Sequence, residues 1–363
     1  MSINPGALRF NSDSMKLEIF RGSANYEGTA SMTGIGTLAA GQWEEIVATS
    51  PDIQTGGIGI TTSHNAGTRG MFAGGFGPTP SPGTRYDDIQ YVQINSTGNA
   101  VDFGTLAASG ALYGNSAFSS RERGFWAGGL NPGVLSSIDT CIFASGGNST
   151  DYGDLITGRY YPACMSSSTR GLIAGGFIGP TPLTATIDYV TMASTGESKD
   201  FGDLEEAVRS QSSVNSPTRG ITLGGYTSDV KNYIQFVTIS TLGNAADFGD
   251  LHTAKYYAAG CSNAVRGLNG GGNNGSNSIN AIEYITMSTL GNGTDFGDLT
   301  VARREIGAVS SATRGVWAGA WSPVTNTMDY VQIMSTGNAV DFGDMIKPGL
   351  LQEQGCSNGH GGL

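Results

Sequence analysis

A tripeptide of Asp, then Phe or Tyr, then Gly recurs six times at nearly constant spacing along the 363-residue chain. An Arg-Gly pair follows the same rhythm. A repeat of 46 to 49 residues predicts a stacked or radial array in which each unit is one supersecondary element. The tripeptides begin at Asp102, Asp151, Asp200, Asp247, Asp295 and Asp341, and the Arg-Gly pairs at Arg69, Arg123, Arg170, Arg219, Arg266 and Arg314.

The unit at 303–344 shows what one repeat contains. The segments "EIGAVSS", "RGVWAGA", "MDYVQIM" and "AVDFGDM" each have the length and alternation of a short strand, and turns rich in Gly, Ser and Asn separate them. No helical period competes with this pattern. We therefore expect an all-β protein made of four-stranded antiparallel blades, which is a β-propeller.

The two ends of the chain supply further strands. The tail "LLQEQGCSNGHGGL" resembles the first strand of a unit, and "GALRF", "KLEIF" and "QWEEIV" match a second, third and fourth strand, with Trp43 at the aromatic position of the fourth. We expect one propeller over 1–363, with blades one to six within 56–345. Residues 5–50 and 350–363 would form a seventh blade that closes the ring and leaves no open edge. The alternative is six blades plus a small N-terminal module.

The recurring Asp-Phe-Gly invites a functional interpretation, because a protein kinase holds magnesium with this tripeptide. A kinase carries it once, together with a Gly-rich loop, a lysine and a His-Arg-Asp loop that are missing here. We instead predict a structural role on the outer strand, where the Asp accepts hydrogen bonds from turn amides or pairs with a repeat arginine such as Arg314. A calcium site is the weaker reading, because the Asp-x-Asp-x-Asp-Gly pattern is absent.

Composition narrows the classes of partner. The net charge of −11 without a basic run argues against nucleic acid, and no apolar stretch is long enough to span a membrane. The start of the chain does not have the pattern of a signal peptide. Four scattered cysteines are expected to be small buried residues, and the three histidines have no metal-ligand spacing, so we expect no metal and no cofactor.

The units resemble kelch repeats. They share a Gly-Gly after a short second strand, an aromatic residue on the fourth strand, and an Arg before the next first strand, as in "DLTVARR" and "DLITGRYY". The kelch outer-strand Trp is present only as Trp43. This resemblance implies a propeller scaffold.

Two segments resemble bacteriophage proteins. "PGALRFNSDSMKLEIFRG", followed by a Trp strand, is similar to a segment of phage tail-fibre and other virion proteins. The repeat "TRGxxAGG…IDYVTIxSTGNAxDFGDL" is similar to repeats in structural proteins of tailed phages of marine cyanobacteria. The resemblance implies a virion component, assembled in the host cytoplasm and carried on the particle surface in several copies, as a tail fibre, an adhesin or a decoration.

The repeat also predicts where a ligand would bind. In antiparallel blades, the second-to-third-strand loops and the blade-to-blade connections share one face, and these loops vary in length and content. They carry aromatic residues among Asn, Thr and Ser, a mixture that suits stacking on sugar rings. The candidate ligand-binding residues are Phe76, Tyr86, Phe177, Tyr226 and Trp321.

These features predict a non-enzymatic virion structural protein whose variable-loop face binds a host-surface glycan or another virion protein. Two alternatives remain. One is a pure assembly module of the tail or capsid. The other is a glycan depolymerase that uses carboxylates such as Glu205 and Glu206, which break the "DLTxAR" pattern.

Overall fold

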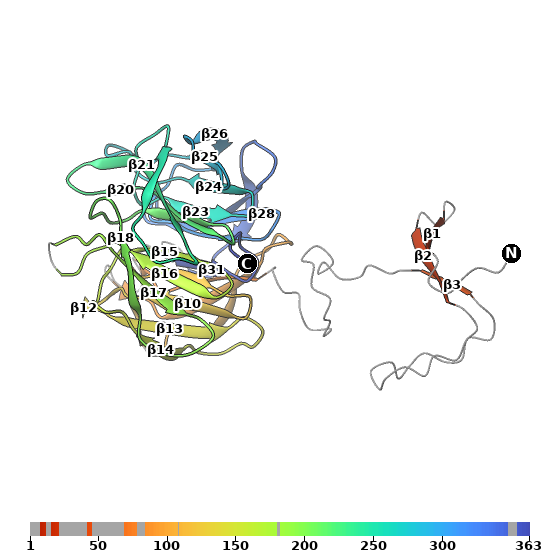
Figure 1. Ribbon diagram of the computed structural model, residues 1–363, viewed down its shortest axis with the longest axis horizontal. Coiled ribbons are helices and arrows are strands. Elements are labelled where there is room, and N and C mark those ends of the chain that lie inside the picture. Colours follow the sequence, from red (N-terminus) through yellow and green to blue (C-terminus); the bar gives the residue numbers. More distant parts are fainter. Residues whose placement is uncertain are drawn as a thin grey trace. The chain divides into compact units, whose positions relative to one another are not determined.

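The computed structural model divides the chain into two compact units, Met1–Asn65 and Ala66–Leu363 (Figure 1). In the second unit the structure describes residues 69–77, 84–107, 109–179, 182–347 and 354–363. In the first unit it describes three strands, which form one antiparallel sheet in the order β1-β2-β3. These strands are β1 (Leu8–Asn11), β2 (Lys16–Arg21) and β3 (Gln42–Glu45).

The second unit is a β-propeller of six four-stranded antiparallel blades. In each blade the first strand faces the central axis and the fourth lies outside. The first three blades are β31 (Gln354–Ser357), β4 (Arg69–Ala73), β7 (Asp88–Gln93) and β8 (Val101–Thr105); β9 (Ser116–Ser119), β10 (Arg123–Ala127), β13 (Ser137–Ile142) and β14 (Thr150–Asp154); and β15 (Ala163–Ser166), β16 (Arg170–Ala174), β17 (Thr186–Thr191) and β18 (Lys199–Asp203).

The remaining blades follow the same order. They are β19 (Ser212–Asn215), β20 (Arg219–Tyr226), β21 (Val230–Thr238) and β22 (Ala246–Asp250); β23 (Ala259–Ser262), β24 (Arg266–Gly270), β25 (Ala281–Thr286) and β26 (Thr294–Asp298); and β27 (Gly307–Ser310), β28 (Arg314–Ala320), β29 (Thr325–Gln332) and β30 (Val340–Asp344). Two short ribbons lie in the variable loops, β5 (Phe76–Gly77) with β6 (Thr84–Arg85) and β11 (Leu130–Asn131) with β12 (Gly133–Val134).

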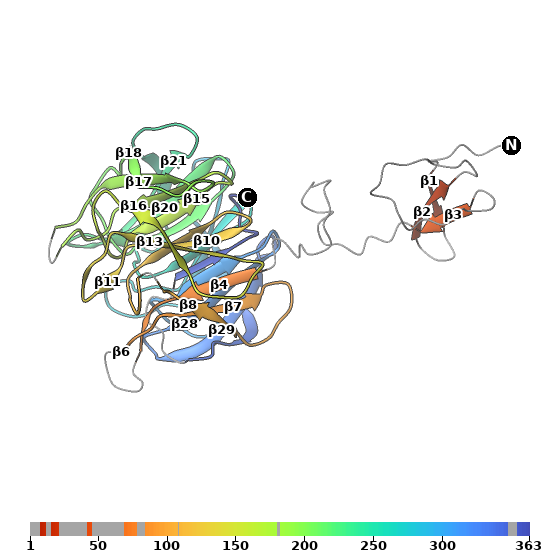
Figure 2. The same ribbon diagram turned by 90° about the horizontal axis from the view of Figure 1, so that it is seen from below.

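The C-terminal strand closes the ring, but not in the predicted way. β31 pairs with β4, in the register Gln354↔Ala73 to Ser357↔Gly70, and so completes the blade of residues 69–105. The three N-terminal strands form a separate sheet. The seven-blade arrangement is therefore wrong, and the alternative of six blades with a small N-terminal module is the observed fold. Figure 2 shows the β4-β7-β8 blade beside β28 and β29 of the last blade.

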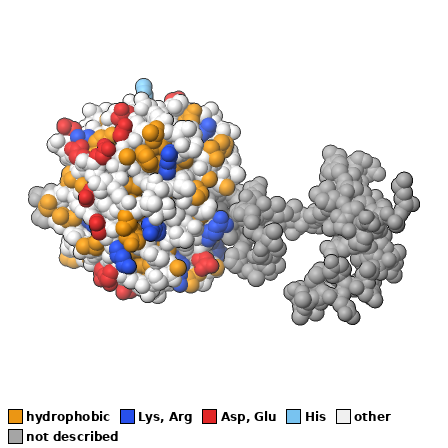
Figure 3. Space-filling view, viewed as in Figure 1, with side chains coloured by type: hydrophobic (Ala, Val, Ile, Leu, Met, Phe, Trp, Pro, Cys, Tyr) orange, Lys and Arg blue, Asp and Glu red, His pale blue; other side chains and the backbone are white. Residues whose placement is uncertain are grey.

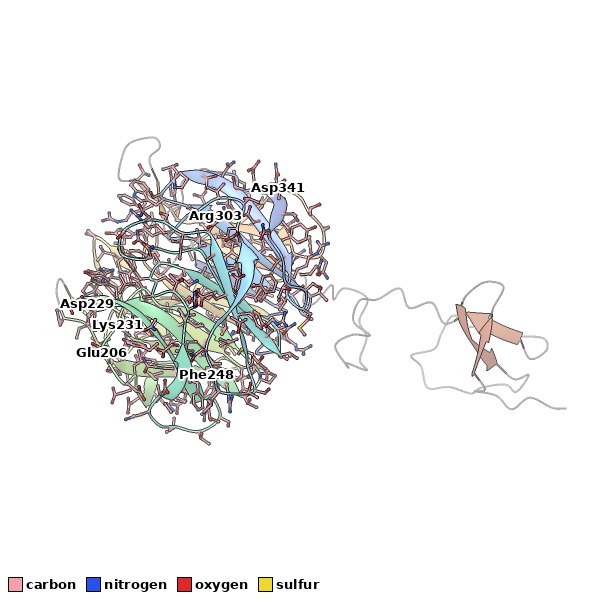
Figure 4. The ribbon with its side chains drawn as sticks, turned by 90° about the horizontal axis from the view of Figure 1, so that it is seen from above. Glu206, Asp229, Lys231, Phe248, Arg303 and Asp341 are labelled. Atoms are coloured by element: carbon pink, nitrogen blue, oxygen red, sulfur yellow. The ribbon has the colours of Figure 1, made fainter. Side chains whose placement is uncertain are left out.

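The Asp-Phe/Tyr-Gly tripeptides occupy equivalent positions in the six outer strands, as predicted. Their aromatic rings are buried between blades; Phe103, for example, packs with Trp126 and Cys141 of the following blade. The aspartates are exposed, and Figure 4 shows Asp341 at the rim of the propeller. The burial of the ring and the exposure of the carboxylate follow from the period-two alternation of a strand.

Each tripeptide forms a joint with a turn of the next blade. In one joint the amide of Gly337 donates to the carbonyl of Phe296 at 2.8 Å, and the amide of Asp298 donates to Asn338 Oδ1 at 3.1 Å. A Cβ placed on Gly297 would lie 2.4 Å from the carbonyl oxygen of Gly337, so the close approach requires glycine. The recurring Asp-Phe-Gly is thus explained by blade assembly.

Of the two partners predicted for these aspartates, a turn amide or a repeat arginine such as Arg314, the arginine is not paired with them in the described ranges. The guanidinium of Arg314 lies over the ring of Tyr330, at 4.7 Å, and donates to the carbonyl of Ile94 in the neighbouring blade at 3.3 Å. Arg170, Arg219 and Arg266 make the corresponding contacts in their blades. In the part of the chain that the structure describes, no ion pair joins Arg314 to Asp341. The arginines therefore bridge blades through carbonyl oxygens.

A second set of charges is buried inside the blades. The third strands carry a buried polar residue at equivalent positions, and three of these residues are carboxylates paired with a base from the connection that enters the blade (Arg303 is labelled in Figure 4). A fourth blade has Val208 in place of the base, and Gln235 in place of the acid. The charged pairs are Arg159–Asp188 at 3.0 Å, Lys255–Glu283 at 3.1 Å and Arg303–Asp329 at 3.0 Å.

Six residues at the ends of the inner strands form a hydrogen-bonded ring around the axis. The Ser310 hydroxyl donates to the carbonyl of Ser262 at 2.9 Å and accepts from its amide at 3.3 Å. Ser357 repeats this pattern with Ser310, at 2.7 and 3.2 Å. The members are Ser119, Ser166, Asn215, Ser262, Ser310 and Ser357.

Residues 358–363 cover this end of the axis. Nε2 of His360 lies 3.2 Å from the carbonyl oxygen of Ser119, and Nδ1 accepts from the amide of Gly362 at 3.0 Å, which identifies a neutral imidazole protonated at Nε2. The amide of Gly361 donates to the carbonyl of Ser262 at 2.9 Å. Burial lowers the pKa of His360 to about 4. The tail therefore plugs one end of the propeller, and a ligand at the axis would have to approach the other end.

Candidate functional site: an aromatic collar around the open end of the axis

The site is built from two kinds of segment that meet at the end of the axis opposite the tail. One is the connection that leads into an inner strand, and the other is the first residue after the Gly-Gly of a second strand, or after Gly319-Ala320 in the last blade. Isolated backbone bridges join them, as in Tyr160↔Phe177, Arg209↔Tyr226 and Tyr256↔Asn273. In these three blades one connection residue and one loop residue therefore lie side by side at this face.

Within the described ranges, residues two positions before five of the inner strands are joined in a chain of backbone hydrogen bonds that runs around the axis. The amide of Tyr161 donates to the carbonyl of Gly114 at 2.6 Å, Ser210 to Tyr161 at 3.0 Å, Tyr257 to Ser210 at 3.0 Å and Glu305 to Tyr257 at 2.9 Å. The four donors have φ between 55° and 58°, and Gly114 has φ 71°. Left-handed conformations of non-glycine residues are uncommon and cost about 1–3 kcal/mol each. Their repetition around the axis indicates a rigid, preformed rim.

Nine aromatic side chains gather at this rim, and we call them the aromatic collar. The ring of Tyr161 lies 5.7 Å from Tyr257 and 6.4 Å from Tyr113, and Phe76 lies 5.2 Å from Tyr113 and 6.2 Å from Trp321. All nine are partly exposed. The collar consists of Phe76, Tyr113, Tyr160, Tyr161, Phe177, Tyr226, Tyr256, Tyr257 and Trp321.

An arginine is held among these rings. The guanidinium carbon of Arg209 lies 4.9 Å from the centre of Phe177, 4.8 Å from Tyr226 and 5.7 Å from Tyr257. Its Nη1 donates to Tyr257 Oη at 2.9 Å and to Ser210 Oγ at 3.1 Å. A guanidinium stacked on aromatic faces and fixed by hydrogen bonds loses little further freedom when it binds a ligand.

Two buried polar side chains next to the collar lack protein partners. Oε2 of Glu305 makes no hydrogen bond to the described residues, and neither does the side-chain amide of Gln211. Glu305 is 9% exposed and Gln211 7%. Burial raises the pKa of Glu305 to about 7, although Arg304 and Arg209 act in the opposite direction. A buried polar group without a partner is costly, so both groups are poised to bind water or a ligand.

Gln211 lines a cavity of about 60 Å³ that runs between the inner strands. Ser212, Ser262 and Ser357 also line it, and His360 lies at its plugged end. The volume is enough for roughly four water molecules and too small for a sugar ring. A ligand at this face would therefore rest on the collar and not enter the axis.

Four of the five predicted ligand-binding residues belong to the collar: Phe76, Phe177, Tyr226 and Trp321. The fifth, Tyr86, does not. It is 5% exposed, packs in the core between the first and last blades with Phe72 and Phe342, and is covered by Lys347. The backbone of Tyr86 bridges to Leu112, and this pairing turns its side chain into the core.

Sequence reasoning missed the five tyrosines and the arginine that the connections contribute. The signal was present as "GRYYP" and "AKYYA", which repeat at equivalent positions before two inner strands. The loops vary in length and content, which is typical of ligand-binding segments, whereas the connections have the regular pattern of the structural repeat.

The carboxylates considered for hydrolysis lie elsewhere. Glu205 and Glu206 are exposed on the connection into the β19-β22 blade, and Glu206 lies 3.2 Å from Lys231 at the periphery (Figure 4). Tyr233 Oη also donates to Glu206, at 3.1 Å. An exposed, ion-paired carboxylate differs from the apolar setting that keeps a glycosidase acid protonated.

Three further observations concern metal ions, membrane spans and cysteines. Within the described ranges no group of three or more His, Cys, Asp or Glu side chains is placed to hold a metal ion. The same residues include no helix of the length and apolar character that a membrane span requires. The four cysteines are buried free thiols, as expected. The face seen in Figure 3 carries charges of both signs, interspersed with neutral side chains.

No family model matches the chain, and no curated protein matches it either.

Proposed function

We propose that the protein is a non-enzymatic component of a phage virion whose propeller binds a host-surface glycan through the aromatic collar. The observation that carries the proposal is the collar itself: nine partly exposed rings on a rigid rim at the unplugged end of the axis. Sugar rings present apolar C–H faces that stack on aromatic side chains, and their hydroxyls suit the Asn, Ser and Thr of the surrounding loops.

The virion setting is supported by the sequence resemblances described above, and the fold agrees with it. A ring of six joined blades is a rigid mount that holds loops of varied content on one face. The N-terminal sheet contains the segment that resembles phage tail-fibre proteins, so this unit is the proposed attachment to the rest of the particle.

The test is binding of the purified full-length protein to a glycan array and to candidate host cells. We expect selective glycan binding in the wild type. Trp321→Ala and Phe177→Ala should each weaken it about 2- to 12-fold, the loss expected when one aromatic stacking contact of about 0.5–1.5 kcal/mol is removed. Leu290→Ala is the matched control, because Leu290 is an exposed apolar residue in a turn at the opposite face.

The other outcomes identify different functions. The protein could bind no glycan on the array and no host cell, and instead copurify with a virion protein that contacts the collar. This result would overturn the glycan-binding proposal and favour the assembly module. A fall in the viscosity of a polysaccharide solution would contradict the non-enzymatic assignment. Loss of that activity in Glu205→Gln or Glu206→Gln would assign it to those carboxylates.

A further inference from the structure

Arginine side chains next to the collar give its surroundings a charge opposite in sign to the net charge of the whole chain. The net charge of the protein is −11. At the collar, however, the guanidinium of Arg209 contacts three rings, and that of Arg85 lies 5.6 Å from the centre of the Tyr113 ring. Arg304 precedes Glu305 on the rim, and its backbone carbonyl accepts from the amide of Trp321 at 3.4 Å. Arginines thus stand at three of the connections or loops that carry collar residues.

The hydrogen bonds of Arg209 leave part of its fork available. Nη1 is occupied by Tyr257 Oη and Ser210 Oγ. Within the described residues, Nε and Nη2 have no hydrogen-bond partner, and the side chain is partly exposed. No carboxylate is within ion-pair distance of Arg209 in the same ranges. The aromatic rings and the Tyr257 hydroxyl therefore orient the guanidinium of Arg209, while its Nε and Nη2 can still donate hydrogen bonds to an anionic ligand.

Glu305 is an acidic residue that interacts electrostatically with this arginine. Its carboxyl is buried, with Oε2 unpaired, and its elevated pKa of about 7 means that it is only partly ionised at neutral pH. The acidic residues Asp229 and Glu206 lie at the periphery near Lys231 (Figure 4), and Lys231 forms an ion pair with Glu206. The local balance at the collar is therefore positive.

We propose that the collar ligand is an acidic glycan, in which the carboxylate of a uronic or similar sugar binds the free edge of Arg209 while the sugar ring stacks on the neighbouring aromatic side chains. This inference rests on the proposed glycan-binding function and narrows it to a substrate class. A planar guanidinium matches a carboxylate with two parallel hydrogen bonds, which a neutral hydroxyl cannot reproduce. Each charge-assisted hydrogen bond is strong enough to give about a 10- to 100-fold preference.

The experiment uses the purified full-length protein and a panel of uronate-bearing polysaccharides, each paired with its carboxyl-reduced form. Binding is measured by calorimetry or biolayer interferometry at low and at raised NaCl concentration. We expect at least one acidic member to bind 10-fold or more tightly than its reduced partner, with a preference that shrinks as salt rises.

Three variants assign the preference to the site. Arg209→Gln should reduce acidic binding 10-fold or more and leave binding of the reduced form within about 2-fold. Arg209→Lys keeps the charge without the fork and should retain only part of the preference. Arg219→Gln is the control, because Arg219 also lies over an aromatic ring, Phe236 at 4.9 Å, but at the opposite face.

Thermal unfolding of each variant shows whether it has folded. Equal binding of acidic and reduced forms by the wild type would overturn the acidic-ligand inference and leave glycan binding standing. An acidic preference that survives in folded Arg209→Gln and Arg209→Lys would also overturn it. No binding to any member of the panel would overturn both this inference and the proposed function.

Discussion

The amide of Gly98 donates a 2.8 Å hydrogen bond to the carbonyl of Phe342, near the other end of the propeller sequence. The same joint recurs between successive blades. Its contribution to the free energy of unfolding can therefore be measured at the joint between Gly297 and Gly337. A side chain on Gly297 would both enter a region of φ near +145° and press its Cβ against the carbonyl of Gly337. Gly297→Ala should lower the free energy of unfolding by about 2–4 kcal/mol in a denaturant titration.

Gly337→Ala separates the two causes. Gly337 has φ +150°, but a Cβ there would meet nothing within 4 Å. It should cost only the backbone strain, about 1–2 kcal/mol. Equal losses in the two variants would show that the close approach between blades contributes nothing.

The buried ion pairs offer a second test, because the chain contains its own neutral counterpart. Arg303→Val should cost about 3–5 kcal/mol, since it leaves the carboxylate of Asp329 buried without its base. The double variant Arg303→Val with Asp329→Gln reproduces the Val208 and Gln235 combination of another blade, in which Gln235 Oε1 accepts from the amide of Glu205 at 2.8 Å. It should recover more than half of the lost stability, measured by equilibrium unfolding. A double variant that is less stable than the single one would contradict this account.

The C-terminal tail predicts a pH effect. The folded state lowers the pKa of His360 from 6.5 to about 4, so the unfolded chain binds the proton more tightly between these values. The contribution of the neutral imidazole to the free energy of unfolding is therefore fully present above pH 6.5. As pH falls toward 4, this contribution is lost, and the free energy of unfolding decreases by about 3 kcal/mol. His360→Gln should remove this dependence. The observable is the difference in unfolding free energy between wild type and variant at pH 7 and pH 4.5; a constant difference would contradict the buried neutral state.

Glu305 should act in the opposite sense over nearly the same range. Its folded pKa, about 7, exceeds the ordinary value of 4.5, so protonation stabilises the folded state as pH falls from 7 to 4.5, by up to about 3 kcal/mol. Relative to wild type, Glu305→Gln should therefore become progressively less stable as pH is lowered through this window. If the difference in unfolding free energy between wild type and Glu305→Gln did not change with pH, the carboxyl of Glu305 would be solvated and not buried.

The sequence predicted the blade, because the repeat exposes its four strands, its turns and its buried aromatic positions six times over. It also predicted that the tail at 350–363 contributes a first strand, which the structure has at Gln354–Ser357. It could not choose the partner of that strand, since the edge of any blade offers the same row of backbone donors and acceptors. The prediction placed blades one to six within 56–345. It therefore took the inner strand of the 69–105 blade from this range, in residues that lie outside those described. In the structure β31 takes that position.

The candidate site was predicted in part for a similar reason. Loop residues such as Phe177 and Trp321 could be assigned to one face from topology alone. Tyr161 and Tyr257 could not, because their exposure depends on the left-handed backbone at the start of the inner strands, and no pattern of apolar residues encodes it. Tyr86 was misassigned because a local bridge to Leu112 decides which way its ring points.

The most direct test of the central claim is a hydrogen-exchange map of the full-length protein with and without a glycan identified on the array. The account predicts slower exchange on binding in the connections at 109–116, 158–163, 207–212 and 254–260, with little change in the turns at 240–244 and 334–338. Protection confined to those turns, or to residues 1–65, would contradict the assignment of the binding face to the aromatic collar.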